Sequence, residues 1–233
     1  MQELEYKNWN ITNRNALIIS LEGIDYTGKT SICNMLKKSL TKKLSRDVIF
    51  LSDPPLIEPW VNLKNLFEMC EEIDKLSEAI LLLSARIDYL NRIIKPNLLK
   101  GAIIILDRYT DSWFVYQSIR LRSYFGSQEK AMNFLISINQ ILENNDVIIP
   151  PHKTIFLTVD IENLIKRMMN RNIISKYEQI EFLMEVQKKY LLLANNEKKR
   201  FIIIDTSSKS LYQLHKEIEE KILSLTKYYT IIP

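Results

Sequence analysis

The sequence predicts an α/β fold, a three-layer sandwich in which a five-stranded, mainly parallel sheet carries helices on both faces. Short, almost wholly apolar runs recur along the chain and alternate with longer segments of helical periodicity. Because these runs lack the alternation of a sheet with one face in water, they indicate buried parallel strands. The length of 233 residues suffices for one such domain with a sizeable core and no disulfides.

The expected strands are Leu17–Leu21, Val48–Leu51, Ala102–Leu106, Thr154–Val159 and Phe201–Asp205. The expected helices span about 29–44, 60–71, 75–95, 112–122, 128–143, 178–195 and 211–225. Pro96 is expected to stop the third helix, because proline lacks the N–H group that would continue it. We expect a single domain over residues 16–233 with right-handed crossovers, preceded by a polar arm over residues 1–15.

One motif stands between the first strand and the first helix. Residues 23–30 read G-x-x-x-x-G-K-T, the pattern of a P-loop, in which backbone N–H groups surround phosphate oxygens at a helix start. In such a loop Lys29 reaches the β- and γ-phosphates, and the Thr30 hydroxyl is offered to Mg²⁺. Contacts to a nucleoside triphosphate are therefore expected from Gly23, Tyr26, Thr27, Gly28, Lys29 and Thr30.

Charged side chains also occur where the pattern is otherwise apolar. Arg86 falls within the apolar stripe of the helix over 75–95, and a buried guanidinium needs an anion or other acceptors. A structural ion pair, or an arginine that reaches the edge, explains Arg86 as well as a binding role does. Asp107 and Arg108 end the third strand, where open α/β sheets bind ligands. Asp107 could hold Mg²⁺ and Arg108 could brace phosphate charge, but Asp107 could equally cap the next helix.

A basic stretch follows the fourth strand. Arg167 and Arg171 are four residues apart and lie on one helical face, and Lys176 follows them. Such a cluster is usually a solvated face. Near a phosphate site it could instead belong to a lid, over about 167–178, that closes over the transferring group.

Composition excludes several classes of protein. The formal charge is +4 and the basic residues are scattered, which gives no case for nucleic-acid binding. Cys33 and Cys70 lack metal-ligand spacing and are expected to be small core residues in a reduced compartment, and two histidines make a zinc site improbable. No segment approaches the ~18 uninterrupted apolar residues of a membrane span, and the polar start is no signal peptide. We therefore expect a soluble, cytoplasmic protein with no membrane partner.

The motifs also distinguish among P-loop proteins. A GTPase would need a guanine-reading N-K-x-D stretch late in the chain, and the sequence has none. A translocating ATPase is usually larger, and the strand ending at Asp107 has no second acidic residue to activate water. A small kinase fits better, because it needs an acceptor pocket, arginines and a lid around the P-loop.

Several segments resemble one family of such kinases. Residues 22–30 resemble the E-G-x-D-x-x-G-K-T of thymidylate kinases, and residues 107–117 resemble their D-R-Y-x-x-S-x-x-A-Y-Q. Leu83–Arg86 is similar to the family's F-x-A-x-R, and residues 176–178 with 190–194 are similar to its lid and following helix. The chain thus resembles the thymidylate kinase family of P-loop nucleoside-monophosphate kinases from the first strand to about residue 195.

This resemblance implies that the chain uses ATP and Mg²⁺ to phosphorylate dTMP to dTDP, as a homodimer. It assigns catalysis to Lys29, Asp107, Arg108 and Arg171, the metal to Thr30 and Asp107, and a further ATP contact to Arg167. It assigns acceptor binding to Asp25, Arg86, Arg108, Tyr109, Tyr116, Gln117 and Tyr177. Arg86 would contact the thymine edge, and the aromatic residues would wall the deoxyribose against a ribose 2′-OH.

One segment departs from the family pattern. After the second strand, the family usually carries an arginine and a phenylalanine or glutamate around a proline, which clamp the acceptor phosphate and stack on the base. This chain has Leu51-Ser52-Asp53-Pro54-Pro55 there, without an arginine. Three alternatives therefore stay open: a kinase for a different deoxynucleotide or nucleotide, a deoxynucleoside kinase, and a nucleotide-binding regulatory protein without acceptor chemistry.

Overall fold

The computed structural model describes residues 16–70, 72–169 and 180–231. Within them a five-stranded sheet has the order β2-β3-β1-β4-β5, and every neighbouring pair is parallel, which confirms the predicted α/β fold. The strands are β1 (Leu17–Gly23), β2 (Val48–Ser52), β3 (Ile103–Asp107), β4 (Lys153–Thr158) and β5 (Phe201–Asp205). The α-helices are α1 (Lys29–Lys43), α2 (Leu63–Met69), α3 (Lys75–Tyr89), α4 (Lys95–Leu99), α5 (Thr110–Arg120), α6 (Gln128–Asn144), α7 (Ile161–Met169), α8 (Ile180–Asn196) and α9 (Leu211–Ile231).

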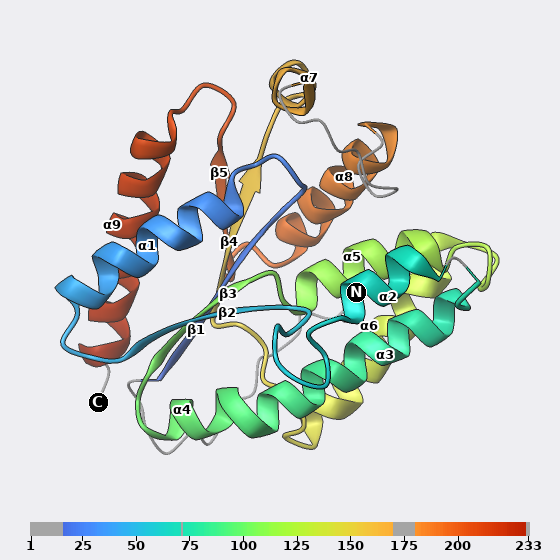
Figure 1. Cartoon of the computed structure of the whole chain (residues 1–233), viewed down its shortest axis with the longest axis horizontal. Coiled ribbons are helices and arrows are strands. Elements are labelled where there is room, and N and C mark those ends of the chain that lie inside the picture. Colours follow the sequence, from blue (N-terminus) through green and yellow to red (C-terminus); the bar gives the residue numbers. More distant parts are fainter. Residues whose placement is uncertain (1–15, 71, 170–179, 232–233) are drawn as a thin grey trace.

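The central strand β1 divides the core into two faces, because successive side chains of a strand point to opposite sides. Leu17, Ile19 and Leu21 pack in one cluster with the apolar side chains of α1 and α9. Ile18 packs in another cluster with residues of α3, α4, α5 and α6. Figure 1 shows α1 and α9 on one side of the sheet and the α3, α5, α6 group on the other. The sandwich therefore has its three predicted layers.

The helix that begins at Lys75 does not stop at Pro96. A π-helical segment (η1, Leu90–Ile94) continues α3, and α4 follows it with Pro96 in its first turn. The Lys95 N–H donates to the Leu90 carbonyl, five residues back, so the wider turn shifts the hydrogen-bond register just before the proline. A proline is tolerated in a first helical turn, where its missing N–H has no intrahelical partner to lose. The expectation of a helix end at Pro96 was wrong for this reason.

The two cysteines differ in environment. Cys33 is half-buried on α1, whereas Cys70 is exposed, and both are free thiols. The expectation that both are core residues was wrong for Cys70, which is the C-cap of α2 and lies beyond the buried face of that helix. Across residues 16–70, 72–169 and 180–231, no helix combines the length and the apolarity that crossing a bilayer requires.

Candidate active site

Three neighbouring strands end at the same edge of the sheet. The pairing register places Leu21 of β1 opposite Asp107 of β3, and Asp107 opposite Ser52 of β2. The chain segments that follow these strands therefore meet beyond one edge, the one at which open α/β sheets bind ligands. The P-loop, the Asp107-Arg108 pair and the turn at Asp53 all come from these segments.

The P-loop conformation explains its glycines. Gly23 has a φ of +144°, and a Cβ there would lie 2.5 Å from the carbonyl oxygen of Leu157, so no other residue fits without moving β4. Gly28 has a φ of +92° and stands at the N-cap of α1. Tyr26 and Thr27 are buried, and the Thr27 hydroxyl donates to the Ile24 carbonyl at 2.8 Å. Their predicted nucleotide contacts stay predictions.

Lys29 is the cation inside this loop. Its side chain is 5% exposed, and Nζ donates to the Ile24 carbonyl at 2.7 Å. Burial lowers the pKa of Lys29 to about 8, with a further contribution from Arg108, while Asp25 opposes the shift. The ammonium is thus held within the loop and faces carboxylates that keep it protonated at neutral pH.

Thr30 and Asp107 bring two oxygen atoms together at the start of α1. The Thr30 hydroxyl donates to Asp107 Oδ2 at 3.0 Å, across two adjacent strands. The N-cap of α5 is Tyr109, without a side-chain cap, so the alternative of a helix-capping Asp107 is not what the structure has. A hydroxyl and a carboxylate are the hard oxygen ligands that Mg²⁺ takes together with phosphates and water. The residues present therefore fit a Mg²⁺ ion.

Arg108 joins the P-loop to the following helix. Its φ is +68°, and this turn directs Nη2 to Asp25 Oδ1 at 2.6 Å and Nη1 to the Gly23 carbonyl at 3.0 Å. Its guanidinium carbon lies 5.1 Å from the centre of the half-buried Tyr116 ring. Burial opposes ionisation of Asp25, but Arg108 and Lys29 outweigh it and hold the pKa of that carboxyl below its usual value. The sequence-predicted Asp25, Arg108 and Tyr116 thus lie together.

Arg86 satisfies both interpretations drawn from the sequence. It is 2% exposed, and its Nε donates to Asp53 Oδ2, an ion pair that accounts for the buried charge. Its Nη2 lies 3.5 Å from the Tyr109 carbonyl, and its Nη1 is buried with no hydrogen-bond partner within the described ranges. The Oε1 atom of Gln117, on α5, is likewise buried without a partner there. Buried polar atoms left in this state are exceptional in native proteins and call for a ligand, a water or a functional reason.

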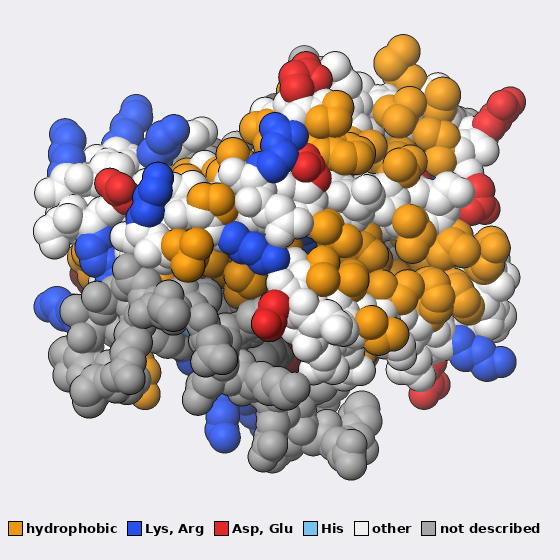
Figure 2. Space-filling view, turned by 90° about the horizontal axis from the view of Figure 1, so that it is seen from below, with side chains coloured by type: hydrophobic (Ala, Val, Ile, Leu, Met, Phe, Trp, Pro, Cys, Tyr) orange, Lys and Arg blue, Asp and Glu red, His pale blue; other side chains and the backbone are white. Residues whose placement is uncertain are grey.

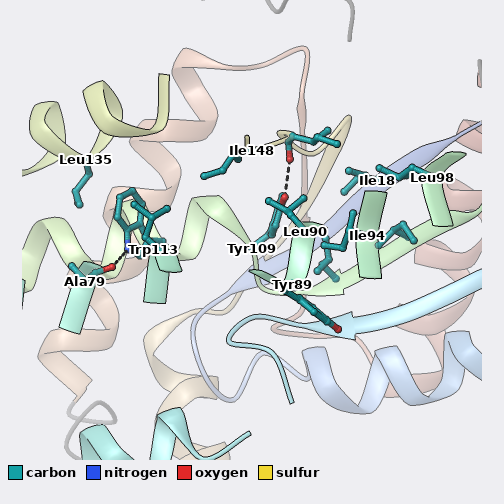
Figure 3. Close-up of a cluster of buried hydrophobic side chains, with 14 of the residues drawn as sticks. Ile18, Ala79, Tyr89, Leu90, Ile94, Leu98, Tyr109, Trp113, Leu135 and Ile148 are labelled. Atoms are coloured by element: carbon teal, nitrogen blue, oxygen red, sulfur yellow. Dashed lines mark hydrogen bonds between the residues drawn. The ribbon is translucent and has the colours of Figure 1, made fainter. Parts of the chain in front are cut away.

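Tyr109 and Trp113 lie in the core beneath Arg86. Figure 3 shows Tyr109 reaching toward the segment beside Ile148, where its hydroxyl donates to the Ile149 carbonyl at 2.8 Å. The Trp113 indole donates to the Ala79 carbonyl at 2.9 Å. The guanidinium of Arg86 lies 5.5 Å from the Tyr109 ring and 5.7 Å from the Trp113 ring. Tyr109 is fully buried, and its predicted contact with a deoxyribose stays a prediction.

The basic stretch after β4 is described only in part. Arg167 lies on α7, and its Nη1 donates to the Tyr26 carbonyl at 3.0 Å. Its Nη2 donates to the Thr206 carbonyl, just after β5, at 2.6 Å. Arg167 therefore joins the P-loop to the end of β5, beside the predicted ATP site. The other predicted lid residues, Arg171, Lys176 and Tyr177, lie outside the described residues.

The sequence reasoning assigned no role to Glu22, although the motif contains it. Its carboxylate accepts hydrogen bonds from the Tyr109 N–H, at 2.7 Å, and from the Ser112 and Tyr190 hydroxyls. Burial raises the pKa of Glu22 to about 7, and the nearby Asp111 carboxylate raises it further. A carboxylate at the end of an otherwise apolar strand was the signal that could have drawn attention to it.

Asp53 was also missed. The sequence showed an aspartate after β2, at the edge that carries Asp107, but local pattern gave no hint of its partner 33 residues away on α3. An aspartate at the carboxyl end of a predicted parallel strand, in a chain with an unexplained buried arginine, was the available signal. These features together define a P-loop nucleotide-binding protein, with a second group of polar side chains beside the phosphate loop.

Comparison with known proteins narrows this class. The family model described as "Thymidylate kinase" matches residues 21–218. A probable thymidylate kinase of Methanocaldococcus jannaschii is 33% identical over 202 residues, which cover 87% of this chain and 93% of that protein. One from Methanococcoides burtonii is 28% identical, covering 89% and 96%. A crystal structure of thymidylate kinase from Ehrlichia chaffeensis shares the fold, with a TM-score of 0.67, 24% identity and coverage of 89% and 98%. The chain belongs to the thymidylate kinase family.

Proposed function

We propose that the protein is a nucleoside-monophosphate kinase that transfers the γ-phosphate of ATP to dTMP, giving ADP and dTDP. The observation that carries this proposal is the position of Arg108. It touches the P-loop through the Gly23 carbonyl and the acceptor-side carboxylate through Asp25, and so it stands between two substrate sites. A protein that only bound ATP would not need this second, polar site beside the loop.

On the donor side, the backbone N–H groups at the start of α1 and the Lys29 ammonium would bind the phosphates of ATP. Thr30 and Asp107 would hold Mg²⁺. That ion, when bound, would neutralise charge on the β- and γ-phosphates. Arg167, held by the Tyr26 and Thr206 carbonyls, is placed to contact the nucleotide on the far side of the loop.

On the acceptor side, Asp25 and Arg108 would face the sugar and phosphate end of dTMP. The unpartnered Nη1 of Arg86 is a donor, and the unpartnered Oε1 of Gln117 is an acceptor. Thymine carries a carbonyl oxygen at position 4 and an N–H at position 3, which is the complementary pair. Cytosine carries an amino group and an unprotonated nitrogen at these positions, so the same two protein atoms would discriminate against dCMP.

The reaction requires alignment more than covalent chemistry by the protein. An oxygen of the dTMP phosphate forms the new bond to the γ-phosphorus, and the bond from that phosphorus to the β,γ-bridging oxygen breaks. The bridging oxygen leaves with the electron pair as part of ADP. Lys29 and Arg108 would stabilise the charge that is shared among the phosphates during this exchange.

A coupled assay of ADP formation tests the proposal. The wild type and Lys29→Ala would be assayed with ATP and dTMP, dUMP, dCMP, dGMP, UMP or thymidine. We expect the highest kcat/KM with dTMP, and its loss in the Lys29 variant. No turnover with any acceptor would refute a kinase and support the regulatory alternative, which the family relationship does not favour. Best turnover with another acceptor would refute only the assignment of dTMP.

We further infer a homodimer in the cytoplasm. Figure 2 shows apolar side chains gathered on one half of a face, the half that in Figure 1 contains α2, α3, α5 and α6. Exposed apolar residues in these elements include Leu66, Met69, Ile80 and Ile141. Covering such a patch with a second copy would remove it from water. Sedimentation equilibrium should give twice the chain mass of 27.5 kDa, and a monomer at micromolar concentration would refute the dimer.

A further inference from the structure

The three nitrogen atoms of the Arg86 guanidinium have different surroundings. The Nε donates to Asp53, the Nη2 lies at a long 3.5 Å from the Tyr109 carbonyl, and the Nη1 is buried without a partner in the described part of the chain. The rings of Tyr109 and Trp113 lie within 5.7 Å of the guanidinium carbon. The group is thus anchored at its inner nitrogen and left unengaged at one outer nitrogen.

This attachment fixes a direction as well as a charge. A guanidinium is planar and rigid, so holding its Nε against one acceptor determines where both outer nitrogens point. The acceptor is itself well held, because the Asp53 N–H donates to the Asp107 carbonyl at 3.1 Å. Asp53 is 7% exposed and forms its ion pair at the end of β3, beside the candidate active site.

A second buried acid–arginine pair on the same helix is built differently. Glu78, also on α3, binds Arg120 of α5 through both outer nitrogens, one to each carboxylate oxygen. This is a bidentate pair that joins two helices and directs neither outer nitrogen to a ligand. Both pairs neutralise a buried charge, but only the Asp53–Arg86 pair leaves an outer nitrogen for another molecule. The difference indicates that Asp53 does more than stabilise the fold.

We propose that Asp53 is a positioning residue that determines base specificity. By holding Arg86 at Nε, it presents Nη1 to the acceptor base and so selects a base with a carbonyl oxygen, rather than an amino group, at that edge. This proposal rests on the proposed function, because it names the specificity device of the same acceptor site. The segment after β2 thus serves base selection in this chain, without the arginine usual in the family.

The test measures acceptor discrimination in Asp53→Asn. Asparagine keeps the size and an oxygen acceptor but removes the charge that fixes Arg86. We expect the ratio of kcat/KM for dTMP to kcat/KM for dCMP to fall by about tenfold or more, because a poorly directed donor no longer rejects the amino group. The change should lie mainly in KM for dTMP, and KM for ATP should stay within about twofold of wild type. An unchanged ratio in a folded variant would overturn the proposal.

Glu78→Gln is the matched control, because it breaks a buried acid–arginine pair on the same helix. We expect it to lower Tm as Asp53→Asn does, since each leaves a buried guanidinium without its counter-charge. It should leave the dTMP to dCMP ratio unchanged. An equal fall of that ratio in Glu78→Gln would show that loosening of α3, and not positioning by Asp53, causes the effect.

A second comparison removes the dependence on the folding of Asp53→Asn. Arg86→Met is compared with the double variant Asp53→Asn/Arg86→Met, in which no unpaired arginine remains. If Asp53 acts through Arg86, the two variants discriminate equally between dTMP and dCMP. A further loss of discrimination in the double variant would overturn the proposal.

Calorimetric dissociation constants for dTMP and dCMP give a readout that does not depend on turnover. The ratio of these two constants should move with Asp53→Asn as the kinetic ratio does. An enzyme without turnover that still loses this binding discrimination would refute the proposed function and leave the positioning role standing. Unchanged binding discrimination in an active enzyme would refute the positioning role alone.

Discussion

The donor half of the site is one continuous loop, whereas the acceptor half draws on segments from several parts of the chain. Residues 23–30 supply the glycines, the lysine and the threonine of the donor half. The acceptor half combines Asp25, Asp53, Arg86, Arg108 and Gln117, which come from the P-loop, the end of β2, α3, the end of β3 and α5. The donor half uses backbone N–H groups, and the acceptor half uses side chains held by ion pairs.

This difference has consequences for how each half fails. The backbone geometry of the donor half is fixed by Gly23 and Gly28, and substitutions of its side chains should affect chemistry with little effect on acceptor binding. The acceptor half depends on buried charge pairs, in which the loss of one partner disturbs the other. Variants should therefore separate kcat effects in the donor half from KM and specificity effects in the acceptor half.

The largest expected effect is that of Lys29→Ala. Loss of the ammonium removes charge stabilisation from the phosphates, and we expect kcat to fall by about 10²–10³-fold. The affinity for dTMP, measured by calorimetry without ATP, should stay within about twofold because Lys29 belongs to the donor half. A large loss of dTMP affinity would contradict the separation of the two halves.

Next in size is Arg86→Met. Removing the buried donor should lower kcat/KM for dTMP by about 10–100-fold and leave KM for ATP unchanged, because only the base contact is lost. Arg92→Met is the control on the same helical run, since Arg92 forms only a partly exposed ion pair with Asp88. If both variants lower kcat/KM equally, the acceptor role of Arg86 is wrong.

Gln117→Leu should separate stability from activity. Its Oε1 is buried without a partner in the described residues, and leucine has a similar size without that cost. We expect the free energy of unfolding in urea to rise by about 1 kcal/mol, while kcat/KM for dTMP falls by about tenfold. A variant that is less stable and fully active would show that Gln117 serves the fold instead.

The smallest expected effect concerns Glu22, which lies between the two halves. Because burial raises the pKa of Glu22 to about 7, from the 4.5 of a free glutamate, the folded state holds its proton more strongly than the unfolded state. Its contribution to stability is fully present below about 4.5 and is lost as the pH rises to about 7. Glu22→Gln should therefore lose less stability than the wild type between pH 5 and 8.

That comparison must be made as a difference between the two proteins. His152 is buried and has its pKa lowered to about 4, so it destabilises the fold as the pH falls, which opposes the effect of Glu22. Glu143, whose pKa burial raises to about 7, acts in the same direction as Glu22. Both are unchanged in Glu22→Gln and cancel. Equal slopes of unfolding free energy against pH in the two proteins would contradict the assignment to Glu22.

The strands and the donor half were predictable because they depend on local sequence. Apolar runs located all five strands to within two residues at each end, and the G-x-x-x-x-G-K-T spacing located the P-loop. Arg86 was recognised as a charge in an apolar stripe, but whether it formed an ion pair or bound a ligand could not be decided from periodicity. The structure shows why: it has an ion-pair partner at Nε and an unpartnered Nη1.

The rest required the tertiary structure. Asp53 meets Arg86, and Glu22 meets Tyr190, only because the sheet brings distant segments to one edge. Pro96 misled the reading because the π-helical turn before it shifts the hydrogen-bond register, a local feature that the proline rule does not include. Side-chain partners across long separations are the part of a site that spacing in the sequence does not determine.

Product analysis with γ-³²P-labelled ATP and dTMP tests the central claim most directly. The claim is that the two halves bind two nucleotides side by side and pass a phosphoryl group between them. The label should appear in dTDP, in amounts equal to the ADP formed, and not as inorganic phosphate. Label released as inorganic phosphate, or label retained in ATP while both nucleotides are bound, would contradict the account.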